Sequence, residues 1–139
     1  MTDDTDITAR RIARFLEGDS FAVVGASTNR AKYGNKVLRC YLQHGRTVYP
    51  VNPRAARIEG VRCYPNLTSL PQRVDGVSII TPPAITETVV RDAIETGVPM
   101  LWMQPGAESE RAIRDAERAG IEVIAGGPCI LVVMGYREH

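Results

Sequence analysis

Short apolar runs alternate along this chain with segments whose apolar residues recur every three to four positions, and this alternation restricts the fold more than any other feature. Five runs are predicted to be strands, and each ends at or near glycine, proline or asparagine: residues 21–25, 47–53, 76–83, 98–106 and 121–127. Strands that alternate with helices of about 10 to 15 residues form parallel sheets that are covered on both faces. The pattern therefore predicts an α/β protein.

The segments between these runs have the spacing of amphipathic helices. Pro83 suits the first position of a helix, and glycines at positions 45, 97 and 120 are well placed to end three of them. The predicted helices are residues 7–17, 35–44, 83–95 and 108–119. The last apolar segment, residues 130–136, either pairs at a sheet edge or covers the sheet, because its periodicity suits both. We expect a single domain over residues 1–139, a doubly wound, Rossmann-like parallel sheet of about five strands with helices on both faces.

The charge balance argues against nonspecific binding to nucleic acid. Lys and Arg total 17 against 16 Asp and Glu, and the net charge of +1 gives too weak a field to hold a polyanion. An anionic ligand must therefore be small and held locally. No apolar run approaches the roughly 20 residues that span a bilayer, so we expect no membrane partner.

The cysteine pattern bears on metal binding and on the compartment. Cys40, Cys63 and Cys129 are far apart, and their spacing matches neither a zinc site nor a redox pair. The first residues are acidic and polar and do not resemble a signal peptide. We therefore expect no metal and a cytoplasmic location.

Ligands of open parallel sheets bind outside the carboxyl ends of the strands, so the residues at those ends are the candidate site. After the first strand, the sequence runs through Gly25 into a helix, as in a dinucleotide fingerprint, but Ser27 and Arg30 replace the second and third glycines and Gly34 comes later. Such a loop can still bind a diphosphate through backbone amides, hydroxyl groups and the charges of Arg30 and Lys32.

The end of the second strand favours a phosphorylated ribose. An NAD site carries Asp or Glu there, whereas this chain has Asn52, Pro53 and Arg54. A guanidinium can bind a phosphate bidentately. NADP and coenzyme A both carry a ribose phosphate, so Arg54 is compatible with either ligand. It is equally compatible with no ligand contact, as a solvated loop charge.

The order VVGAS, KYG, YPVNP, TPP and WMQPG resembles the stand-alone CoA-binding domain proteins, which are related to the CoA-binding domain of the succinyl-CoA synthetase α subunit. The resemblance covers about residues 8–129. It implies that the diphosphate of coenzyme A is surrounded by Gly25, Ala26, Ser27, Arg30, Lys32, Tyr33 and Gly34. It also implies that Asn52, Pro53 and Arg54 lie by the adenosine and its ribose phosphate, and that Thr81, Pro82 and Pro83 line the cofactor groove.

One departure from the family pattern concerns the thiol end of the cofactor. Single-domain relatives usually have an Asp-Arg-Cys or Asn-Arg-Cys sequence near the end of the fifth strand, whereas this chain has Gly127-Pro128-Cys129. Cys129 is either a buried structural cysteine or a thiol that can form a mixed disulfide with the coenzyme.

No catalytic residues are expected. The synthetase reaction requires a phosphorylatable histidine in a second domain, and the histidines here are His44, before a helix-capping glycine, and His139, the last residue. No Ser-His-Asp order or metal-spaced cluster is apparent. We expect a non-catalytic module that binds coenzyme A or an acyl-CoA as a carrier, sensor or regulator, with a protein partner or a second copy of the chain as candidate partners. The alternative is a small NADP-dependent oxidoreductase.

Overall fold

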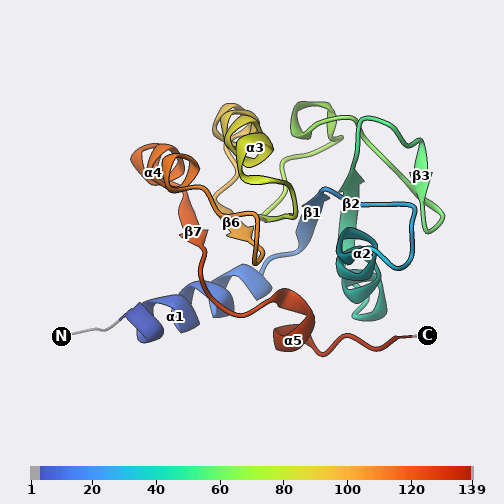
Figure 1. Cartoon of the computed structure of the whole chain (residues 1–139), viewed down its shortest axis with the longest axis horizontal. Coiled ribbons are helices and arrows are strands. Elements are labelled where there is room, and N and C mark those ends of the chain that lie inside the picture. The colour runs from blue at the N-terminus through green and yellow to red at the C-terminus, as the bar shows by residue number, and fades with distance from the viewer. Residues whose placement is uncertain (1–3, 139) are drawn as a thin grey trace.

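A computed structural model describes residues 4–138, and its centre is a five-stranded sheet (Figure 1). All neighbouring strands pair in parallel, and their order is β2-β1-β5-β6-β7. The strands are β1 (Ser20–Val24), β2 (Thr47–Val51), β5 (Gly76–Ile79), β6 (Met100–Met103) and β7 (Glu122–Ile124). The predicted parallel sheet is confirmed, with each strand somewhat shorter than its apolar run.

Helices cover both faces of this sheet, as predicted. One face carries α1 (Asp4–Leu16), α2 (Tyr33–Gln43) and α5 (Ile130–Met134), and the other carries α3 (Pro83–Thr96) and α4 (Glu110–Arg118) (Figure 1). α5 decides the alternative left open for residues 130–136, because this segment forms a short helix over the sheet and does not pair at its edge.

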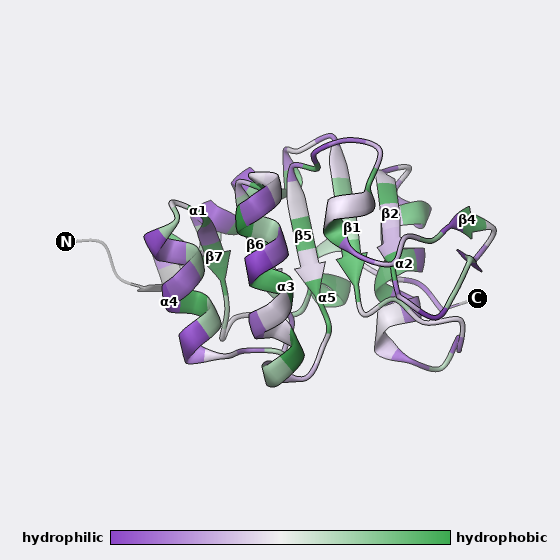
Figure 2. Ribbon diagram, turned by 90° about the horizontal axis from the view of Figure 1, so that it is seen from above, coloured by the Kyte–Doolittle hydropathy of each residue, from purple (hydrophilic) through white to green (hydrophobic). Residues whose placement is uncertain are grey.

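Alternating side chains of the strands divide the core into two halves. In β1, Phe21 and Val23 pack on the side of α1, α2 and α5, whereas Ala22 and Val24 pack on the side of α3 and α4. Trp102 of β6 lies in the first half, edge-on to Phe15 of α1. Figure 2 shows the resulting pattern, with hydrophobic residues along the strands and many hydrophilic ones on the outer turns of α3 and α4.

The segment between β2 and β5 contains structure that the sequence did not indicate. A short antiparallel hairpin joins β3 (Arg57–Ile58) to β4 (Val61–Arg62), and the 3-10 turn η1 (Leu67–Ser69) follows. The hairpin turn places both Glu59 and Gly60 at positive φ, 51° and 76°.

The winding of the sheet determines where a ligand can bind. The chain leaves β1 for β2 on one side, then crosses back so that β5 pairs with the other side of β1. The loops that follow β1 and β5 therefore diverge at the carboxyl ends of these strands, which is where open α/β sheets bind ligands. Among residues 4–138, none of the helices has the length and hydrophobicity needed to cross a bilayer.

Candidate functional site

A cavity of about 800 Å³ opens at the carboxyl ends of β1, β2 and β5. Its walls are the loops after these strands, the start of α2, residues 65–67 and one face of α3. The cavity brings together most of the residues singled out from the sequence: Gly25, Ala26, Ser27, Lys32, Tyr33, Gly34, Asn52, Pro53, Arg54, Thr81 and Pro82.

Two of the predicted site residues are not part of the cavity wall. Arg30 forms an ion pair with Glu59 of the β3–β4 hairpin. Pro83 is the first residue of α3 and is exposed. A role for these two residues in binding stays a prediction.

Two glycines let the loop after β1 lie against its neighbours. Gly25 has φ 95°, and a Cβ on it would lie 2.2 Å from the carbonyl oxygen of Ile80. A Cβ on Gly34 would lie 2.0 Å from the carbonyl oxygen of Gly25. No side chain fits in either place, so Gly34 permits the close packing of helix on strand that the third glycine of a dinucleotide fingerprint provides.

The start of α2 presents unpaired amides to the cavity. Its N-cap residue, Lys32, provides no side-chain acceptor for the first turn, so the amides of Tyr33 and Gly34 have no acceptor among residues 4–138. First-turn amides together with the helix dipole favour an anion. The side chain of Lys32 is exposed and forms no ion pair within the described part of the chain.

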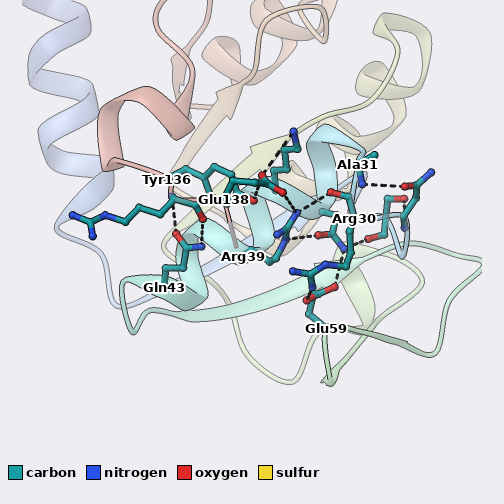
Figure 3. Close-up of polar contacts among 12 residues, drawn as sticks. Arg30, Ala31, Arg39, Gln43, Glu59, Tyr136 and Glu138 are labelled. Carbon is teal, nitrogen blue, oxygen red and sulfur yellow. Dashed lines mark hydrogen bonds and ion pairs between the residues drawn. The ribbon is translucent and has the colours of Figure 1, made fainter.

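The loop between β1 and α2 is held from behind by polar side chains (Figure 3). Arg39 of α2 is 6% exposed and donates from Nε to Oδ1 of Asn35 at 2.7 Å and from Nη2 to the carbonyl oxygen of Arg30 at 2.8 Å. Asn35 donates to the carbonyl oxygen of Ser27 at 2.8 Å and to Glu59 at 3.1 Å. These bonds hold the loop from the α2 side, while the amide of Ala31, which follows Arg30, donates to Oδ1 of Asn29 at 3.0 Å.

Sequence reasoning missed Asn35, Arg39 and Glu59. The spacing of Asn35 and Arg39, four residues apart on a helix, was the one signal in the sequence that could have indicated their contact.

Asn52 connects the loops after β1 and β2. Its Nδ2 donates to the carbonyl oxygen of Ala26 at 2.8 Å, and its Oδ1 accepts from the backbone N–H of Arg54 at 2.8 Å. These two bonds fix the base of the loop that carries Arg54. The exposed guanidinium of Arg54 forms no hydrogen bond or ion pair with residues 4–138. The cavity thus has two cations, Lys32 and Arg54, that are free to bind an anion.

The wall formed by α3 was also missed. Ile85, Thr88, Val89 and Asp92 lie on one face of this helix and line the cavity opposite residues 65–67. Burial, followed by the charge of Glu95, raises the pKa of Asp92 above its ordinary value.

Cys129 lies near the cavity, next to Tyr33. The hydroxyl of Tyr33 donates to Oε1 of the buried Gln104 at 3.0 Å, and the same oxygen accepts from the amide of Ile130 at 2.9 Å. Burial, followed by an interaction with the Cys129 side chain, raises the pKa of Tyr33. Burial and then Cys129 raise the pKa of Cys40 to about 11. Both roles considered for Cys129 stay open, since it is partly exposed but is not among the residues that line the cavity.

Metal binding and histidine chemistry have little support among residues 4–138. No group of three or more His, Cys, Asp or Glu residues among residues 4–138 is arranged to hold a metal ion. His44 lies at the end of α2, where its Nδ1 contacts the carbonyl oxygen of Cys40 at 2.8 Å, and His139 lies outside the described residues.

The comparison with known families is decisive for the kind of protein. A family model described as a CoA binding domain matches residues 19–135. The chain belongs to the CoA binding domain family. This match covers all five strands of the sheet and the whole wall of the cavity, so the resemblance in the sequence is confirmed.

Several relatives are by their names ligases or ligase subunits. The α subunit of ADP-forming acetate–CoA ligase II from Pyrococcus furiosus is 32% identical in an alignment 136 positions long, which covers 90% of this chain and 29% of that subunit. ADP-forming acetate–CoA ligase I from Archaeoglobus fulgidus is 32% identical in an alignment 119 positions long, which covers 78% of this chain and 17% of the ligase. The chain thus spans less than a third of the length of these relatives.

Solved structures include relatives of about the same length. A conserved hypothetical protein from Pyrococcus furiosus is 46% identical, with a TM-score of 0.77 over 82% of this chain and 97% of that one. A hypothetical protein from Pyrococcus horikoshii is 29% identical, with a TM-score of 0.84 over 90% of this chain and 87% of that one. Relatives of about this size therefore exist as separate chains.

Proposed function

We propose that this chain binds coenzyme A, free or as an acyl thioester, in the cavity beside β1, β2 and β5, and that it acts as a non-catalytic carrier, sensor or regulatory module. One observation carries the proposal: unpaired amides at the start of α2 and two free cations, Lys32 and Arg54, line a single cavity at the point where the sheet winding reverses. Coenzyme A carries a diphosphate and, at a distance from it, a ribose phosphate. Each of these anionic groups needs its own amides or cations in the cavity.

The parts of the cavity fit the two phosphate groups. The first-turn amides of α2, the Gly25–Ser27 turn and Lys32 would bind the diphosphate, because close backbone approach and a helix N-terminus favour it. Arg54, at the end of β2, would bind the ribose phosphate, with each charged hydrogen bond contributing about 1.5 to 3 kcal/mol. Thr81 and Pro82 would line the groove between these groups and α3.

The residues around the cavity support binding rather than turnover. Its titratable side chains are Lys32, Tyr33, Arg54 and Asp92, and the pKa of Tyr33 is raised, which leaves its hydroxyl protonated. A nucleophile paired with a base is not among the residues that line the cavity.

The cysteines are free, as a reducing cytoplasm would leave them. The 32%-identical ligase relative from P. furiosus is by its description one subunit of an enzyme. This supports a protein partner or a second copy of the chain as part of the proposal.

Isothermal titration tests the ligand. The purified chain is titrated with CoA, acetyl-CoA, NADP and NAD, and we expect heat from CoA and acetyl-CoA and much weaker binding of both nicotinamide nucleotides. Tight binding of NADP without binding of CoA would overturn the proposal in favour of an oxidoreductase. The relative affinities of CoA and acetyl-CoA then distinguish a sensor of the free thiol from a carrier of the thioester.

A further inference from the structure

Of the four side chains that α3 contributes to the cavity wall, two are apolar, one carries a hydroxyl group and one is acidic. Ile85, Thr88, Val89 and Asp92 are spaced three, four and seven residues from the first of them, so they form one stripe along the helix. Ile85 is 51% exposed although it is a large apolar residue, and it faces the cavity.

The opposite wall has a matching composition. Pro65, Asn66 and Leu67 precede or begin η1, which packs against α3. A slot with apolar side chains on both walls therefore lies between η1 and α3, and it is next to β2 because Tyr64, just before Pro65, pairs with Val51 of β2. In sheets of this type the nucleoside lies beyond the end of that strand, so a flat base is the group that this slot would hold.

Asp92 is the one acidic side chain among the residues that line the cavity. It forms no hydrogen bond or ion pair with residues 4–138, so it is not paired with Lys32 or Arg54, the two cations of the cavity. A carboxylate only accepts hydrogen bonds and repels phosphate. In a cavity suited to a polyanion, Asp92 therefore has to face a neutral part of the ligand that donates hydrogen bonds.

We propose that Asp92 accepts a hydrogen bond from the 6-amino group of adenine, so that the site selects 6-amino purines against 6-oxo purines. The proposal rests on the proposed function, because the base belongs to the coenzyme. Adenine fits both features of the slot: its faces are apolar and its edge carries an exocyclic donor. Hypoxanthine presents a carbonyl oxygen at the same position, and two acceptors would then face each other across the slot.

The size of the expected selectivity follows from the charge. A hydrogen bond to a charged group contributes about 1.5 to 3 kcal/mol, which corresponds to a preference of roughly 10- to 100-fold. Repulsion between the carboxylate of Asp92 and the 6-oxo group of hypoxanthine adds to this preference, whereas partial exposure of Asp92 to solvent reduces it.

The probes are CoA and its deaminated analogue, in which hypoxanthine replaces adenine. Each is titrated by calorimetry into the wild-type chain, into Asp92→Asn and into Glu95→Gln. The Asp92→Asn substitution keeps the shape of the side chain, removes its charge and adds an N–H donor that can bind a 6-oxo group. Glu95 lies three residues further along α3, is exposed and does not line the cavity, so Glu95→Gln is the matched control for loss of one negative charge.

We expect the wild-type chain and Glu95→Gln to prefer CoA by about 10-fold or more, and Asp92→Asn to lose most of this preference. Equal affinity of the wild-type chain for both probes, or a preference that Asp92→Asn retains in full, would overturn the role of Asp92 and leave the proposed function intact. Binding of neither probe by the wild-type chain would overturn the proposed function. Circular dichroism of both variants separates loss of selectivity from loss of fold.

Discussion

Arg39 donates to the backbone carbonyl oxygen of Arg30 at 2.8 Å, and this bond connects the middle of α2 to the loop that borders the cavity. The same guanidinium lies 3.5 Å from Glu138 and 5.5 Å from the centre of the Tyr136 ring (Figure 3). Gln43, at the end of α2, forms two further hydrogen bonds with the backbone of Arg137. Arg39 therefore contacts both the loop after β1 and the C-terminal segment, and Gln43 attaches the same segment to α2 a second time.

We expect Arg39→Met to destabilise the chain by about 2 kcal/mol, because it leaves the carbonyl of Arg30 and the side chain of Asn35 without their donor. Urea unfolding measures this loss. CoA affinity should fall as well, since the loop that connects Ser27 to Lys32 in the cavity wall loses a contact that holds it in place. Arg39→Lys keeps the charge but not the two-pronged geometry, so its affinity should lie between those of the wild type and Arg39→Met. Unchanged CoA affinity in Arg39→Met would show that the loop is held by other contacts.

Gly34→Ala should be among the most damaging small substitutions in the chain. The added methyl would lie 2.0 Å from the carbonyl oxygen of Gly25, a backbone atom that cannot move without separating α2 from β1. We expect a loss of more than about 2 kcal/mol in urea unfolding. Gly45→Ala is the control, since a Cβ there meets nothing within 4 Å and only its φ of 67° opposes the change, at about 1 kcal/mol. Similar losses for both variants would contradict the proposed steric cause.

The parts of the fold that the sequence predicted are those set by local periodicity. β1 was recognisable because FAVVG is apolar on both faces, and α3 because Pro83 begins it and Gly97, at φ 76°, ends it. The β3–β4 hairpin escaped detection, since its strands have two residues each and its turn pairs Gly60 with Glu59, which is an uncommon residue at positive φ.

The candidate site was predictable only where it follows the strand ends. Gly25, Asn52 and Thr81 lie on one rim because parallel strands end at the same edge. The α3 wall was not recognised, because apolar residues at helical spacing, such as Ile85, are also typical of a buried face. The contact of Arg39 with Asn35 follows the four-residue spacing of a helix, whereas its contact with Glu138, 99 residues away in the chain, is encoded by no local pattern.

The ion pair of Glu59 with Arg30 should make stability depend on pH. A hydrogen bond from Asn35 and the pairing with Arg30 lower the pKa of Glu59, against the effect of its burial. Since the pKa in the folded state is below the unfolded value of about 4.3, the stabilisation is present above that pH and is lost as pH falls through the folded pKa. Glu59→Gln should remove this contribution, so its free energy of unfolding should fall less than that of the wild type between pH 6 and pH 3. Parallel pH profiles in urea unfolding would show that other carboxylates account for the acid sensitivity.

The proposed ribose-phosphate contact of Arg54 predicts a difference between two ligands. Dephospho-CoA lacks the 3′-phosphate but is otherwise the same molecule, so Arg54→Glu should weaken CoA by about 10- to 100-fold and dephospho-CoA by much less. Arg57→Glu is the matched control for the charge reversal, because Arg57 lies in β3, donates to the carbonyl oxygen of Gly60 and does not line the cavity. It should change both affinities little, and any general effect of charge is screened further in 0.15 M salt, where the Debye length is about 8 Å. Calorimetric titration of both ligands into both variants measures the difference. Equal losses of affinity for CoA and dephospho-CoA in Arg54→Glu would refute the contact. Such a result would show a general repulsion of the anionic ligand, which does not require the 3′-phosphate to lie beside residue 54.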